Sequence, residues 1–224
     1  MLDLPIYISI LLLVSTILSV WLFYRAASRS NWFLLIIGLW IFLQGGLAYS
    51  GFYMDTLSFP PRFPLLIVPP LVLMIVLFSR VRGRVFIDQL DQKALTLVHV
   101  VRLPVEIMLY GLFIYKAVPE LMTFEGRNPD ILMGITAPIV YYFAFVKKQW
   151  SSRVILIWNI LGLGLLLNIV IHALLSAPLP FQQLAFDQPN IAVIHFPFVW
   201  LPAVIVPIVL FSHLVSIRYY WRKA

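Results

Sequence analysis

A cluster of polar and ionisable side chains stands inside one of the apolar runs of the sequence. His99, Arg102, Glu106 and Tyr110 are spaced three or four residues apart. At 100° per residue of helix, these side chains fall on one face, within about 80° of arc. Counted from Leu95, Arg102 lies about 10 Å and Glu106 about 16 Å along the helix, near the centre of a bilayer. The spacing therefore predicts a polar helix face at membrane depth.

This polar face must point away from lipid. A charge at bilayer depth costs several kcal/mol unless it is paired and faces the protein interior or a wet cavity. Arg102 and Glu106 are four residues apart and can touch on their own helix, so they predict an intramembrane ion pair. We interpret the pair as functional, with Glu106 as the protonatable group and Arg102 as its partner or as an anion binder. The alternative is a structural pair that only fixes helix packing.

Further polar side chains are expected on a later helix. Asn168 and His172 are four residues apart within the run Val154–Ser176 and share one face of it. We count both as candidates for the same ligand- or proton-binding site. Asn159 lies on this run as well. Asparagine also hydrogen-bonds across helix interfaces, so simple contact between helices is the alternative.

The four histidines sort into two layers. His99 and His213 lie about 6 Å and 7 Å from the inner ends of their helices, whereas His172 and His195 lie near outer ends. Two such layers could ligate two haems and carry electrons across the membrane. His172 and His195 could alternatively hold zinc or calcium with the acidic residues of the outer loops. These are Glu120, Glu125, Asp130 and Asp187, although the run from Asn128 is also typical of a turn that starts a helix.

The composition indicates what surrounds these side chains. The chain has 224 residues, of which 62% are hydrophobic and 11% charged, and its mean hydropathy is +0.97. A soluble domain is nearer half apolar and a quarter charged, so this chain cannot cover a soluble surface. The absence of cysteine excludes disulfides, thiolate metal sites and iron–sulfur clusters. The net charge of +7 comes without a basic patch interleaved with exposed aromatics, which excludes nucleic acid as a partner.

Seven apolar runs approach the length of about 20 residues that a membrane-spanning helix needs. We therefore predict an all-α integral membrane protein, a single domain over residues 1–224 with a bundle of about seven transmembrane helices. The expected helices are Leu4–Tyr24, Trp32–Tyr49, Phe63–Ser79, Leu95–Tyr115, Asp130–Val146, Val154–Ser176 and Pro197–Ile217. Between the third and the fourth, the segment Arg80–Lys93 is expected as a short surface helix whose basic residues face anionic headgroups.

The basic residues predict the orientation of the bundle. Twelve of the sixteen fall into alternate loops and the carboxyl-terminal tail, and cytoplasmic loops carry such an excess. We therefore expect a multi-pass protein of the cytoplasmic membrane, with its amino terminus outside and its carboxyl terminus in the cytoplasm. The twelve are Arg25, Arg29, Arg80, Arg82, Arg84, Lys93, Lys147, Lys148, Arg153, Arg218, Arg222 and Lys223.

The leading functional hypothesis is the binding or transport of a small solute or protons. His99 would relay protons toward the cytoplasm, and Tyr110 would extend the polar path outward from Glu106. One rival is a membrane-embedded haem or metal redox protein, or an enzyme, that uses the four histidines. The other is a structural or accessory subunit. No Walker A or GxGxxG motif is present, so nucleotide-driven work is not expected, and the expected partners are the lipid bilayer and the solute or proton.

The orientation can be tested by cysteine labelling, since the chain has no cysteine of its own. Single cysteines at Gln183 and Gln89 should react with an impermeant thiol reagent from opposite sides of the membrane. Gln183→Cys should react in intact cells and Gln89→Cys only after permeabilisation. Labelling of both variants from the same side would contradict the predicted topology.

Overall fold

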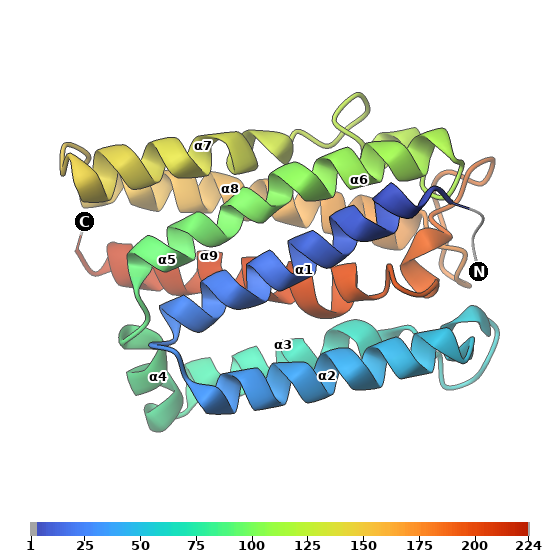
Figure 1. Cartoon of the computed structure of the whole chain (residues 1–224), viewed down its shortest axis with the longest axis horizontal. Helices are drawn as coiled ribbons and strands as arrows, with labels where there is room; N and C mark the ends of the chain where they lie inside the picture. The colour runs from blue at the N-terminus through green and yellow to red at the C-terminus, as the bar shows by residue number, and fades with distance from the viewer. Residues whose placement is uncertain (1–3, 224) are drawn as a thin grey trace.

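The chain folds into a bundle of helices, drawn from the side in Figure 1. This computed structural model describes residues 4–223, and no β-strand occurs among them. The α-helices are α1 (Ile6–Ala26), α2 (Asn31–Tyr49), α3 (Pro64–Ser79), α4 (Val81–Asp88), α5 (Gln92–Val98), α6 (Arg102–Ile114), α7 (Ile131–Tyr141), α8 (Ser152–Leu175) and α9 (Val206–Trp221). Short helical turns connect or extend them: η1 (Phe52–Met54), η2 (His99–Val101), η3 (Glu120–Met122), η5 (Ala192–Ile194), and two π-helical turns, η4 (Tyr142–Val146) and η6 (Leu201–Ile205).

Five stretches are long and apolar enough to cross a membrane. They are α1, α2, α8, the stretch Gln92–Ile114 formed by α5, η2 and α6, and the stretch Leu201–Trp221 formed by η6 and α9. Large apolar side chains cover the outside of the bundle, with Phe42 and Ile75 exposed over 83% and 66% of their surface. Such an exterior suits a lipid solvent. The prediction of an all-helical protein with several helices of membrane-spanning character is confirmed.

A sharp corner separates α3 from α4, whose axes meet at 94°. A Cβ on Gly83 would overlap the backbone of Leu77, so the corner needs a residue without a side chain. At the far end of α4, Arg218 Nε of α9 and Arg222 Nη1 directly after α9 bind the carboxylate of Asp88 at 3.1 and 3.2 Å. The hydrogen bond from Arg218 is the main reason why the pKa of Asp88 lies below its usual value. These contacts hold α4 across the end of the bundle.

The fifth expected span, Asp130–Val146, forms within one residue of its predicted bounds, but it is shorter than the five spanning stretches. α7 and η4 together cover only Ile131–Val146, a helical length of about 24 Å. Asp130, the residue before α7, contacts Arg102, which lies about 15 Å from the start of the stretch Gln92–Ile114. α7 therefore begins beside the middle of α5–α6. The irregular chain that follows α6 and carries η3 connects the end of α6 to the start of α7 (Figure 1).

The four basic regions gather at one end of the bundle. The α1–α2 turn, α4, the α7–α8 turn and the carboxyl-terminal end of α9 all lie at the left of Figure 1, and the connections α2–α3 and α8–α9 lie at the right. The sequence separates these regions widely, so their common position is a property of the fold. An asymmetry of this kind is what a membrane-spanning topology requires.

Two tryptophans attach α2 to the stretch that contains α9. Pro207 has no N–H for the carbonyl four residues before it, and the indole of Trp40 donates to that carbonyl, Ala203 O, at 2.8 Å. In return, Trp200 Nε1 donates to Ile41 O at 3.1 Å. The absence of a side chain at Gly45 leaves room for the Trp200 ring, which a Cβ would approach to 3.1 Å. This reciprocal pair of bonds, which we name the tryptophan clasp, holds the middle of α2.

Replacing Trp40 should therefore weaken the fold, because one hydrogen bond is lost. Trp40→Phe keeps an aromatic ring but leaves Ala203 O without its side-chain donor, at an expected cost of about 1–3 kcal/mol. Thermal unfolding in detergent measures the loss. Trp221→Phe, at a residue that is 69% exposed, is the matched control and should change the melting temperature little. Equal effects of the two variants would contradict the role of the clasp.

Candidate functional site

Arg102 is the first residue of α6, and its guanidinium is buried between three parts of the chain. Its Nη1 lies 2.9 Å from Asp130 Oδ1, and the two side chains are 3% and 6% exposed. Nη1 and Nη2 also donate to Gly162 O of α8 at 3.3 and 3.2 Å. The sequence predicts Glu106 as the partner of Arg102, but the carboxylate that takes this position is Asp130. The local spacing allows the Glu106 contact, and the tertiary fold replaces it with one across helices.

Asn128 links the ion pair to Glu106. Its Nδ2 donates to Glu106 Oε1 at 2.7 Å and to Met122 O at 3.0 Å, and its Oδ1 accepts from the backbone N–H of Asp130 at 3.3 Å. Asn128 is 1% exposed, so its side chain points into the bundle although the residues on either side of it, Arg127 and Pro129, are exposed. The sequence places Asn128 and Asp130 in an outer turn, and the structure corrects this because the turn folds back to meet Arg102.

A stacked histidine pair lies one turn from Arg102, on the side of α5. The rings of His99 and His213 are parallel within 21°, with their centroids 3.8 Å apart, and both residues are fully buried. His213 Nδ1 lies 3.0 Å from Asn159 Oδ1, whereas neither nitrogen of His99 has a hydrogen-bond partner. Gly162 makes the stack possible, because a Cβ there would come within 2.5 Å of His213 Cε1. The sequence predicts these two histidines in one layer, and the fold brings them into contact.

This stacking does not fit the inner haem layer that the sequence allows. Two axial histidines approach an iron atom from opposite faces of the porphyrin, with a nitrogen of each ring directed at the metal. The rings of His99 and His213 instead lie face to face, with no room for a macrocycle between centroids 3.8 Å apart. The stacked pair therefore does not provide two axial ligands for one haem.

The remaining candidates lie away from this centre. Asn168 Nδ2 donates to Arg127 O at 2.8 Å, and His172 Nδ1 lies 2.8 Å from Asn168 O on its own helix. His195 Nδ1 lies 2.7 Å from Ile191 O, and Tyr110 packs its ring against a loop aromatic. Within residues 4–223, no three side chains of histidine or acidic residues gather in a way that could hold a metal ion. The outer zinc or calcium site at His172 and His195 therefore has no support from the fold.

The buried polar cluster borders a cavity of about 230 Å³. Arg102, Glu106, Asp130 and Asn190 supply its polar wall, and the other lining residues are apolar side chains and prolines of α3, α6, α8, η6, α9 and the connecting segments. Glu106 is 1% exposed, and its Oε2 has no hydrogen-bond partner, nor has Arg102 Nε. In the Glu106 carboxylate, Oε1 is thus fixed by Asn128 and Oε2 has no partner, and the ion pair of Arg102 and Asp130 lies beside it.

One protein-family model matches the part of the chain that contains this site. The sequence model of the family described as Domain of unknown function (DUF8737) covers residues 62–220. The chain belongs to this family. The DUF8737 region includes the cavity, the ion pair and both histidines of the stack, and it begins after α1 and α2. No curated protein and no solved structure matches the chain.

The ion pair predicts an asymmetry between two carboxylates. Asp130→Asn leaves the Arg102 guanidinium unpaired and unable to lose its charge, at an expected cost of about 3–5 kcal/mol in unfolding free energy. Glu106→Gln should cost less than about 1 kcal/mol, because the amide oxygen still accepts the bond from Asn128. Melting temperatures in detergent test both, with exposed Asp187→Asn as the control. If Asp130→Asn has the same melting temperature as the control, the paired charge does not stabilise the fold.

Proposed function

We propose that this membrane protein binds a small solute in the cavity beside Glu106 and couples that binding, or transport of the solute, to a proton on the Glu106 carboxyl. We further propose seven passes through the cytoplasmic membrane. In this topology the amino terminus lies outside and the basic end of the bundle faces the cytoplasm. The collection of four separate basic regions at one end supports that orientation. The short α7, together with the irregular segment before it, would serve as the fifth pass.

The observation that carries the proposal is the state of the Glu106 carboxyl. Its Oε1 is held by Asn128 at 2.7 Å, its Oε2 is buried without a partner, and Glu106 is one of the residues that line the cavity. A buried polar atom without a partner is unfavourable unless a proton, water or ligand group completes it. An ionisable residue at membrane depth that faces a cavity is typical of a solute or proton site. Glu106 has the required freedom, because Asp130 already neutralises Arg102.

The start of α7 adds to the electrostatics of the site. Its amino-terminal end lies beside the middle of the bundle, directly after Asp130. The amino terminus of a helix carries a partial positive charge that stabilises nearby negative groups. Transporters place the ends of interrupted helices at their substrate sites in the same way. Together with Arg102, this end would help to hold a negative or polar group of the solute in the cavity.

The walls of the cavity restrict the class of solute. Apart from Arg102, Glu106, Asp130 and Asn190, every lining residue is apolar. A strongly hydrated solute would lose its water without replacement over most of its surface. The cavity therefore favours a small, largely apolar molecule with one hydrogen-bonding group, which would meet Glu106 Oε2 and Arg102 Nε. Leu167, which lines the cavity and is also exposed on the outer surface of α8, marks a thin wall through which such a molecule could enter from lipid.

The histidine stack would serve proton exchange with the basic end of the bundle. His99 is three residues before Arg102 on the continuous stretch Gln92–Ile114, so it lies about one turn closer to that end. Both nitrogens of His99 and Nε2 of His213 are unpartnered, which leaves them able to bind and pass protons through water. Tyr110 lies outside the cavity lining, so the outward path proposed from the sequence is not required.

Infrared difference spectra between low and high pH, recorded on protein in lipid vesicles, test the role of Glu106. A pH-dependent band of a protonated carboxyl should appear in the wild type and disappear in Glu106→Gln, which keeps the volume and the bond from Asn128. Glu120→Gln, at an exposed acidic residue outside the cavity, should keep the band. Vesicles loaded with a pH-sensitive dye should also acidify under a membrane potential with wild type and not with Glu106→Gln. A structural subunit would give neither signal.

A further inference from the structure

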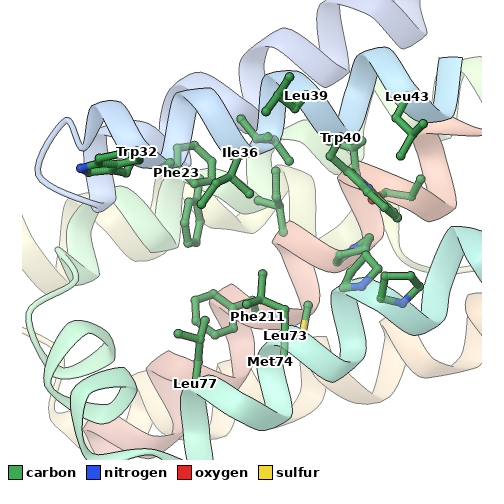
Figure 2. A pocket seen from close by; sticks show the side chains of 18 of the residues that line it. Phe23, Trp32, Ile36, Leu39, Trp40, Leu43, Leu73, Met74, Leu77 and Phe211 are labelled. Carbon is green, nitrogen blue, oxygen red and sulfur yellow. The ribbon is translucent and has the colours of Figure 1, made fainter. Parts of the chain in front are cut away.

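A second apolar hollow, separate from the Glu106 carboxyl, opens between α2 and α3. Its volume is about 640 Å³, and its floor is formed by η6 and α9. Every residue that lines it is apolar or aromatic, and Figure 2 shows side chains of α2 and α3 facing each other across it. We name it the α2–α3 groove. Its size falls within the range of about 300–1,000 Å³ typical of ligand sites.

The groove exists because α2 has no buried residue in its amino-terminal half. The tryptophan clasp holds Trp40 and Ile41 to η6, and the buried residues of α2, which are Gln44, Gly45 and Ala48, all lie on the carboxyl-terminal side of the clasp. Ile36, Leu39 and Leu73 line the groove and remain exposed over half of their surface or more. The groove is therefore continuous with the lipid-facing exterior. Acyl chains of the surrounding bilayer can reach it without passing a barrier.

The groove ends at the basic end of the bundle. Trp32 at the start of α2, Leu77 near the end of α3 and Phe86 of α4 belong to its lining. Arginines flank each of these residues within four positions in the sequence: Arg29 before Trp32, Arg80 after Leu77, and Arg82 and Arg84 before Phe86. The apolar groove thus ends at a mouth, formed by Trp32, Leu77 and Phe86, that is flanked by arginines.

Among the described residues, no ion pair involves any of these four arginines. Asp88 of α4 is already bound by Arg218 and Arg222. Arg29 and Arg82 are exposed, and Arg84 is partly so. Each basic residue near a membrane surface attracts anionic lipid by about 1 kcal/mol. Four of them at one mouth favour an anionic headgroup over a zwitterionic one.

We propose that the α2–α3 groove is a binding site for an anionic phospholipid of the leaflet at the basic end of the bundle. An acyl chain lies along the groove between α2 and α3, and the phosphate lies at the mouth among Arg29, Arg80, Arg82 and Arg84. The apolar length and the cationic mouth match the two parts of such a molecule. A helix of a second copy would fill the apolar length but would leave the arginines without counter-charge. The site involves neither Glu106 nor Arg102, and Pro207 lies between it and the solute cavity.

Native mass spectrometry of the detergent-purified protein tests the site with two lipids of identical acyl chains, phosphatidylglycerol and phosphatidylcholine. One phosphatidylglycerol per chain should be retained, at least several-fold more than phosphatidylcholine. Arg82→Gln with Arg84→Gln should reduce that preference several-fold. The matched control is Lys147→Gln with Lys148→Gln, which removes the same charge from another segment at the same end of the bundle (Figure 1). This control should keep the preference for phosphatidylglycerol. Equal retention of both lipids, or an equal loss in the control, would overturn the proposal.

Leu73→Trp tests the apolar part, because the larger side chain would occupy the groove and should reduce retention of both lipids. A second measurement uses the wild-type protein, so it does not depend on whether this variant folds. Phosphatidylglycerol with a photoreactive group on its acyl chain should cross-link to peptides of α2 and α3 that contain Ile36, Leu39 or Leu73. Cross-links spread evenly over the lipid-facing surface would overturn the proposal. So would a dimer that carries no lipid and is cross-linked through these same helices.

Discussion

The guanidinium of Arg102 sets the requirement that the middle of this bundle satisfies. Arginine keeps its proton in any protein environment, so its burial must be matched by a negative group and by oxygen acceptors. Asp130 and the carbonyl of Gly162 supply both. To bring Asp130 to this depth, the segment after α6 returns into the bundle and α7 begins beside its middle. The cavity, the position of Asn128 and the freedom of Glu106 all depend on this return of the chain.

The sequence predicts the polar helix face and not its partners. The spacing of His99, Arg102 and Glu106 is a local property of one helix, and all three are buried as expected. Asp130 and Asn128 lie between two apolar runs, where hydropathy alone places a residue at the membrane surface. A usable signal was the short length of the following run, which predicts a helix too short for a complete crossing. The outer histidines, by contrast, bond to nearby backbone carbonyls, and no spacing rule distinguishes that state from a ligand.

Prolines in α3 and α9 create a similar problem of partners. The sequence shows that Pro207 and Pro69 free the carbonyls of Ala203 and Leu65, but it does not show which donors take them. The fold assigns Trp40 to the first at 2.8 Å and Gln44 to the second at 3.5 Å, both from α2. Thus α2 contributes hydrogen-bond donors to helices that lack them, while much of its apolar surface stays exposed. This division explains why α2 can be anchored to the bundle and still border an open groove.

The ion pair between Arg102 and Asp130 also bears on how the chain is made. The two residues are 28 positions apart, from 102 to 130, so the arginine leaves the ribosome before the aspartate that neutralises it. A helix with an unpaired arginine near its centre enters lipid at a cost of several kcal/mol. The stretch Gln92–Ile114 is therefore expected to wait beside the insertion machinery until α7 follows, and both then enter the bilayer together. In this protein the order of synthesis and the order of membrane insertion need not coincide.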